Sequence, residues 1–298
     1  MKLVFNQNTN VMKTKLLSIS ALAMLSVTSL FAQEKTTVTA SSADISDNLD
    51  LRAIASVFGD ASNLEDFENR INDPKAQLSN LDLNNDNYVD YLRVIESVEG
   101  NVHLVIVQAV LDKDVYQDVA TIEIERDRNN RVQVQVVGDV YMYGQNYIYE
   151  PVYVHTPVIY NTFWVTNYRP YCSSWYWNYY PSYYYYWNPF PVFRYRNHIH
   201  VHINFGHSYH YASHRRCANV YNNYYGRRGN GYETRYPERS FTNRNVTVRN
   251  RYELDNTRDT RIVNQRERGN TTPRIESPRN ENSPRNNETI RTDAPSRN

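Results

Sequence analysis

Residues 91–110 read YLRVIESVEGNVHLVIVQAV, and this stretch decides the expected fold. Apolar residues recur at every second position on both sides of Glu99-Gly100-Asn101, which is typical of two strands joined by a short turn. Two further runs with this period follow, DVATIEIER at 118–126 and RVQVQVV at 131–137. The sequence therefore predicts four strands of an antiparallel meander.

Two short helices are expected before the strands. The first carries Leu51, Ile54, Val57 and Phe58 at helical spacing. The second follows Ser62 and Glu65, which have the spacing of a capping box, and ends at Asp73-Pro74. Helices packed on one face of a meander give an α+β domain with a modest core.

An acidic loop, LDLNNDNYVD, lies between the second helix and the first strand. Its oxygen-bearing residues have the spacing D-x-N-x-D-x-x-x-D, which suits calcium, a cation that prefers oxygen ligands. The predicted ligands are the side chains of Asp82, Asn84, Asp86 and Asp90 and the backbone carbonyl of Tyr88. The alternative is a polar turn whose Asn and Asp side chains bond their own backbone. An EF-hand is excluded because its twelfth position would be Arg93 and a strand follows.

This spacing resembles the short calcium loops of dockerin repeats and of FG-GAP repeats. The glycine usual at the sixth position is Asn87 here, which also tolerates the left-handed conformation. The resemblance implies a structural calcium ion and covers about ten residues.

Residues 141–232 hold 22 of the 27 tyrosines and all 4 tryptophans, in runs such as WYWNYYPSYYYYWNPFPVF. Tyrosine combines a broad apolar face with one hydroxyl and loses little rotamer entropy on binding, which suits sequence-tolerant adhesion. A β/irregular segment with an aromatic adhesive surface is therefore predicted. The alternative is a low-complexity segment that clings to the acidic domain.

Six of the 8 histidines lie in HIHVHINFGHSYHYASH, namely His198, His200, His202, His207, His210 and His214. On a strand, His198, His200 and His202 would share one face. Two histidines of this face, spaced as H-x-H, form a good bidentate ligand for Zn²⁺, Cu²⁺ or Ni²⁺. The alternative is a strand whose polar face is merely imidazole. A sequestering or structural metal site is favoured over a catalytic one, because no acidic residue lies between Tyr153 and Tyr232.

The 2 cysteines, Cys172 and Cys217, bracket the tyrosine runs and the histidines. A disulfide between them is the expected state of an exported chain. Metal-binding thiols are the alternative.

Charge and composition divide the chain into five parts. A basic and apolar stretch predicts a signal peptide at 1–32, followed by a polar linker at 33–46. An acidic α+β domain (47–140), the Tyr/Trp/His-rich segment (141–232) and a disordered Arg/Asn-rich tail (233–298) follow. Residues 33–140 hold 21 acids against 9 bases, whereas residues 141–232 hold 7 arginines against Glu150 alone. The asymmetry indicates either an interaction surface or mutual attraction of these parts.

The stretches LEDFENRINDP, LDLNNDNYVDYLRVIE and VYQDVATIEIE, followed by a Tyr/Trp-rich half, resemble a group of uncharacterised exported proteins of Bacteroidetes-type bacteria. The resemblance covers about residues 50–165 and implies export to the periplasm, the outer-membrane surface or the medium. It implies no particular activity.

Two functions are compatible with these features. The favoured one is a non-enzymatic interaction protein of the cell envelope or exterior, with a calcium-stabilised head and an aromatic surface that binds a polymer, a protein or another copy. It predicts that the head stays folded without residues 141–232. The other is a protein that binds or sequesters Zn²⁺ or Cu²⁺ through the histidine cluster. The chain contains no nucleophile elbow or phosphate-binding glycine loop, and export with interspersed acids disfavours nucleic acid as a partner.

Overall fold

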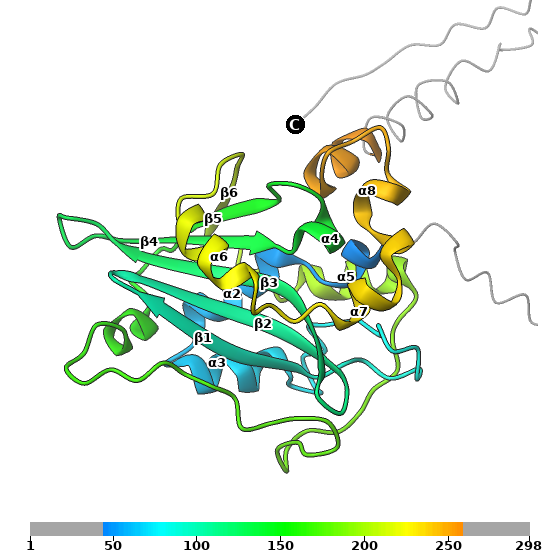
Figure 1. Ribbon diagram of the computed structural model, residues 1–298, viewed down its shortest axis with the longest axis horizontal. Helices are drawn as coiled ribbons and strands as arrows, with labels where there is room; N and C mark the ends of the chain where they lie inside the picture. The colour runs from blue at the N-terminus through cyan, green and yellow to red at the C-terminus, as the bar shows by residue number, and fades with distance from the viewer. Residues whose placement is uncertain (1–43, 259–298) are drawn as a thin grey trace, which may run out of the picture. The chain divides into compact units, whose positions relative to one another are not determined.

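The computed structural model describes residues 44–258, and one antiparallel sheet organises them (Figure 1). Its strands follow the order β1-β2-β3-β4-β5-β6. The first four are β1 (Leu92–Glu99), β2 (Val102–Asp112), β3 (Val115–Arg126) and β4 (Val132–Gly138). They form the predicted meander, and the α+β fold class is confirmed. The tight β1–β2 turn places Gly100 at φ +61°, a conformation that glycine adopts without strain.

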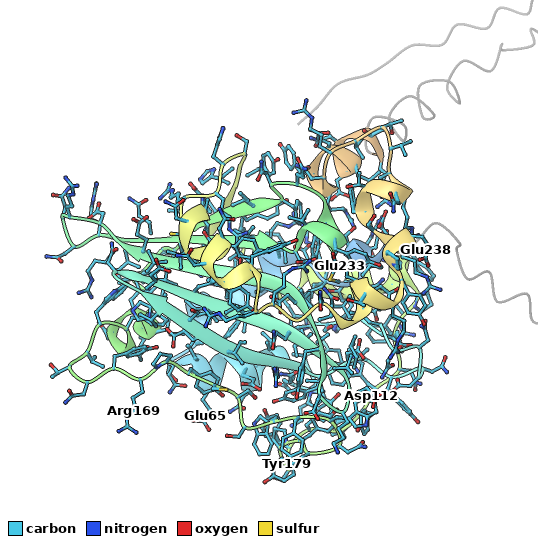
Figure 2. The ribbon with its side chains drawn as sticks, viewed as in Figure 1. Glu65, Asp112, Arg169, Tyr179, Glu233 and Glu238 are labelled. Atoms are coloured by element: carbon cyan, nitrogen blue, oxygen red, sulfur yellow. The ribbon has the colours of Figure 1, made fainter. Side chains whose placement is uncertain are left out.

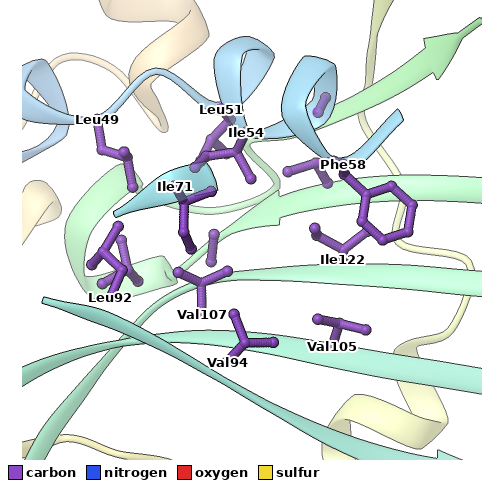
Figure 3. Packing of buried hydrophobic residues seen from close by; sticks show 14 of the residues in the cluster. Leu49, Leu51, Ile54, Phe58, Ile71, Leu92, Val94, Val105, Val107 and Ile122 are labelled. Atoms are coloured by element: carbon purple, nitrogen blue, oxygen red, sulfur yellow. The ribbon is translucent and has the colours of Figure 1, made fainter. Parts of the chain in front are cut away.

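Two helices, α2 (Leu51–Asp60) and α3 (Leu64–Ile71), cover one face of the sheet. Figure 3 shows their apolar side chains pointing at the inward residues of the strands. The labelled contact set comprises Leu49, Leu51, Ile54, Phe58, Ile71, Leu92, Val94, Val105, Val107 and Ile122, all fully buried. One detail of the prediction is wrong: α3 is capped by Asn63, whose side chain accepts a hydrogen bond from Asp66 N, rather than by Ser62.

The tyrosine-rich segment belongs to the same core. A short helix, α4 (Val140–Tyr143), leads into strand β5 (Ile148–Val152), and β6 (Ser208–Ala212) pairs with β5 to extend the sheet. The helix α5 (Val192–His200) and the 3₁₀ turns η1 (Ile45–Asn48) and η2 (Val158–Thr162) lie on the side of the sheet that α2 and α3 cover. Six aromatic side chains enter the main core cluster, namely Tyr141, Tyr143, Tyr147, Tyr149, Phe163 and Tyr232.

The described chain up to Leu254 is therefore one compact unit. A boundary at residue 140 does not separate two cores, because Tyr143 is fully buried and donates a hydrogen bond to Leu49 O at 2.9 Å. A head that folds without residues 141–232 stays a prediction, and the shared core argues against it. The segment beyond residue 140 adds apolar side chains to the core that residues 44–140 form.

The part of the predicted tail that the structure describes, residues 233–258, is also ordered into elements. It contains the end of α7 (Gly231–Arg235), then η3 (Pro237–Arg239) and α8 (Phe241–Arg244). Asn250 is buried and donates to Gln145 O at 2.8 Å, so the stretch up to Leu254 contacts the chain between α4 and β5. The remaining predicted tail, the signal peptide and most of the linker lie outside the described residues.

The other face of the sheet is covered by α6 (Ala218–Tyr225), which crosses in front of the strands in Figure 1. Two of its tyrosines, Tyr221 and Tyr224, pack on Leu104 and Ile106 of β2. A small hollow of about 190 Å³, including space open to solvent, lies beside this contact. Its lining includes Asp118, Thr121, Asp139, Arg215 and Tyr221. Each helix of residues 44–258 is too short or too polar to span a lipid bilayer.

Candidate functional site: an acidic loop against an exposed aromatic surface

The acidic loop folds around its own side-chain oxygens. The Asp82 carboxylate accepts hydrogen bonds from Asp86 N and Asn87 N, both at 3.1 Å. Asp86 in turn accepts from Tyr88 N at 2.8 Å. Asn85 and Asn87 have φ values of 61° and 68°, which Asn tolerates better than most residues. Both predictions for this loop, the calcium loop and the polar turn, require a backbone that wraps around these side-chain oxygens.

The carboxylates of this loop have unfavourable surroundings. Asp90 is buried, and its pKa lies well above the ordinary range because burial outweighs the hydrogen bond that it accepts from Leu83 N at 2.7 Å. Burial also raises the pKa of Asp82, and the nearby Asp86 raises it further. A bound cation would favour the ionised forms of Asp82 and Asp90. Among residues 44–258, no three His, Cys, Asp or Glu side chains are placed to share one metal ion, so the calcium ligand set stays a prediction.

The loop packs directly against the tyrosine-rich run. Val89 N donates to Trp187 O at 2.9 Å, and the Asn188 side chain donates to Asn87 O at 2.8 Å. The rings of Tyr88 and Tyr186 lie 5.3 Å apart. Two features that the sequence analysis treated separately thus form one site. No local pattern in the sequence indicated this contact, because it joins residues about 100 positions apart.

Six tyrosines of the acidic loop and of residues 176–186 are exposed, and we call them the aromatic surface. They are Tyr88, Tyr176, Tyr179, Tyr183, Tyr185 and Tyr186, with exposed fractions of 41–56%. Tyr176 and Tyr179 stack at 5.0 Å, and Tyr179 projects from the lower edge of the molecule in Figure 2. Patches of exposed aromatic side chains in a folded domain mark interaction sites.

A buried layer supports the aromatic surface. Tyr184 and Trp187 belong to the same run but are buried with Val89, Tyr91 and Val110. The run therefore alternates between side chains that anchor it on the sheet and side chains that face solvent. Such anchoring removes the conformational freedom that a loose tyrosine-rich segment would lose on binding.

A buried carboxylate that the sequence analysis missed fixes the start of the run. Glu68 of α3 accepts hydrogen bonds from Tyr91 Oη at 3.0 Å, Tyr171 Oη at 2.9 Å and Ser173 Oγ at 2.6 Å. Burial raises the pKa of Glu68, while the three donors oppose this shift. The only signal in the sequence was an acid on the apolar side of a helix, next to Phe67.

The histidine prediction is wrong in its secondary structure. His198 and His200 lie on helix α5, and His202 lies in the turn after it, so the expected strand is absent. His207 accepts a hydrogen bond from Val154 N at 3.3 Å. His210 of β6 lies opposite Glu150 of β5 in the strand register. His214 contacts Ser213. The helix brings His198 and His202 together, with ring centroids 5.0 Å apart. Burial, and then the charge of His198, lower the pKa of His202.

Both cysteines are free thiols, which corrects the predicted disulfide. Cys172 lies beside edge strand β1, where its backbone forms an isolated antiparallel β-bridge with Ile95. Cys217 caps α6 and follows Arg215, whose guanidinium binds Glu123 of β3. Two or more strand spacings of about 4.8 Å therefore separate the thiols, beyond the Cα distance of about 7 Å that a disulfide spans. Burial raises the pKa of Cys217 to about 12, so its thiol is protonated at neutral pH.

Comparison with models of known families, with curated proteins and with solved structures yields no match.

Proposed function

We propose that this protein is an exported, non-enzymatic binding protein that attaches to a polysaccharide of the cell envelope or exterior through the aromatic surface. The observation that carries the proposal is the set of six exposed tyrosines, in and beside a run in which Tyr184 and Trp187 are buried. A preorganised surface binds with a smaller entropy cost than a flexible one. Flat tyrosine rings offer their faces to the C–H groups of sugars, and their hydroxyls offer hydrogen bonds.

Polar groups beside the rings suit the same ligand. Asp86, Asn87 and Asn188 border Tyr88 and Tyr186, and their oxygens and amide groups match the hydroxyls of a sugar. Lys and Arg are scarce in this part of the chain, since residues 176–188 contain none. A neutral or amine-bearing polysaccharide therefore fits better than a strongly anionic polymer.

A sedimentation experiment tests this function. The mature chain is mixed with insoluble peptidoglycan, and with chitin as a second polymer, and the bound fraction is measured as a function of polymer concentration. Tyr176→Ala combined with Tyr179→Ala is expected to weaken binding at least about tenfold, because each stacking ring contributes roughly 1 kcal/mol. Phe193→Ala is the matched control, since Phe193 is a 72% exposed ring outside the aromatic surface. Equal binding by the double variant and the control would contradict the proposal.

Within the same proposal, calcium binds the acidic loop and holds it against the aromatic surface. The ligands are Asp82, Asn84, Asp86, the Tyr88 carbonyl and Asp90. Calcium at about 100 times its Kd would stabilise the folded chain by about 2.7 kcal/mol. For a unit of this size, that corresponds to a rise in Tm of roughly 5 to 10 °C.

Thermal unfolding after chelation, with and without added calcium, measures this effect. Asp86→Ala is expected to abolish the rise, whereas Glu238→Ala, at an exposed acid far along the chain, is expected to retain it. A wild-type Tm that does not respond to calcium would leave the loop a polar turn. The aromatic surface would still be tested separately by sedimentation.

A further inference from the structure

Helix α5 and the turn that follows it hold His198 and His202 close together. The buried side of the helix consists of Tyr195 and Ile199, and Ile203 continues this side beyond the helix end. Tyr195 Oη donates to Leu78 O at 2.8 Å, which holds the helix on the chain segment after α3. His198 and His202 are four residues apart, so their side chains lie on the same flank one turn apart. His200 is exposed and lies on another side.

The ring of His198 has a fixed tautomer and orientation. Its Nε2 lies 2.8 Å from Ala76 O. A carbonyl oxygen can only accept, so Nε2 carries the proton and Nδ1 keeps its lone pair. A backbone carbonyl bound to the far nitrogen is the usual way in which proteins orient a metal-binding histidine.

The separation of the two rings matches that of two imidazoles on one metal ion. With metal–nitrogen distances of about 2.0–2.1 Å and ligand angles of about 90–109°, two ring centroids lie roughly 4.5–5.2 Å apart. The centroids of His198 and His202 are 5.0 Å apart, with an interplanar angle of 57°. The pair therefore has the ring separation that two imidazoles on one ion require.

We propose that His198 and His202 form a two-histidine site for a divalent transition metal of the Zn²⁺, Cu²⁺ or Ni²⁺ class. Water completes the coordination, because no third His, Cys, Asp or Glu of residues 44–258 joins the pair. Imidazole is a suitable ligand for all three ions. The pairing differs from that of a strand, on which His200 would be an equal partner of His198 and His202. This site is independent of the aromatic surface and of the acidic loop.

Titration with Zn²⁺ by isothermal calorimetry tests the site, using the full mature chain without a polyhistidine tag. His202→Ala is expected to weaken the tightest binding at least about tenfold, and His198→Gln similarly, because either change leaves a single imidazole. His200→Ala is the matched control and is expected to bind like the wild type. Far-ultraviolet circular dichroism and Tm check that each variant is folded.

A second readout separates ligation from a merely structural role. Two-dimensional ¹H–¹⁵N spectra of the histidine rings, recorded without and with Zn²⁺, are expected to show shifts for His198 and His202 and none for His200. The inference is overturned if His202→Ala binds Zn²⁺ as the wild type does. It is equally overturned if His200→Ala loses as much affinity as His202→Ala, or if the wild type does not bind. The calcium and polymer experiments do not depend on any of these outcomes.

Discussion

Replacing Asp139 by Asn is expected to change how the stability of this protein depends on pH. Asp139 lies between β4 and α4, where its side chain accepts a hydrogen bond from Tyr141 N at 3.0 Å. Burial raises the pKa of Asp139 to about 7, although Arg228, 3.9 Å away, lowers it and Asp118 raises it. In the unfolded chain the same carboxyl titrates near its ordinary value of 3.8.

The direction and size of the effect follow from proton binding. Between these two pKa values the folded chain holds one more proton than the unfolded chain, so this group stabilises the folded state at low pH. That contribution is lost as the pH rises towards 7, at about 1.4 kcal/mol per pH unit. Between pH 5 and pH 7 the loss is roughly 2 kcal/mol, because the slope flattens as Asp139 itself ionises near pH 7. Asparagine keeps the oxygen that accepts from Tyr141 N but cannot ionise.

Urea unfolding of the wild type and of Asp139→Asn at pH 5, 6, 7 and 8 measures this difference. The free energy of unfolding should fall with pH in the wild type and fall less in the variant. Asp127→Asn is the control, because hydrogen bonds from Arg131 and Asn129 lower the pKa of this partly exposed acid. Its contribution is lost only as the pH falls below about 4, so its curve should parallel the wild type. Parallel curves for Asp139→Asn and the wild type would refute the reasoning.

Two further predictions concern the tyrosine-rich segment and the thiols. Tyr143→Ala should lower the free energy of unfolding by about 3–5 kcal/mol, whereas Tyr185→Ala, at a residue that is 56% exposed, should lower it little. A fragment of residues 44–140 should show no cooperative unfolding by circular dichroism. A cooperative transition of that fragment would contradict the shared core. Because Cys172 and Cys217 are free, a reducing agent should leave the Tm unchanged, and thiol titration of the unfolded chain should find both.

Local patterns were sufficient to predict the meander and the two first helices. The strands 91–98 and 102–110 have a period of two on both sides of a glycine turn, and neighbouring strands pair without any long-range information. The α3 prediction succeeded because Leu64, Phe67 and Ile71 have helical spacing before Pro74.

The histidine stretch shows where such patterns fail. Ile199, Val201 and Ile203 alternate as on a strand, but Tyr195, Ile199 and Ile203 also recur at the spacing of a helix. The helical set is the one that is buried, with exposed fractions of 1%, 4% and 5%, while Val201 is 76% exposed. Burial against a surface formed by distant residues selected the helix over the strand. In the local sequence, only Tyr195, which precedes the histidines, indicated the helical spacing.

The same long-range contacts explain the charge asymmetry of the chain. Polar and acidic side chains occupy the outer face of the sheet, and the tyrosine-rich segment supplies their partners. Asp118 accepts from Tyr224 Oη at 2.9 Å, and Glu123 pairs with Arg215. Farther away, Arg251 binds Asp47 at 2.6 Å.

These pairs are the contacts expected if the acidic domain and the basic segments attract one another, which was one of the two interpretations of the charge pattern. Charges paired within the fold are a weak basis for inferring an external partner. The rings of the aromatic surface differ, because 41–56% of each remains open to solvent after the rest of the run has packed. The search for a ligand should therefore begin at Tyr176 and Tyr179 rather than at the arginines.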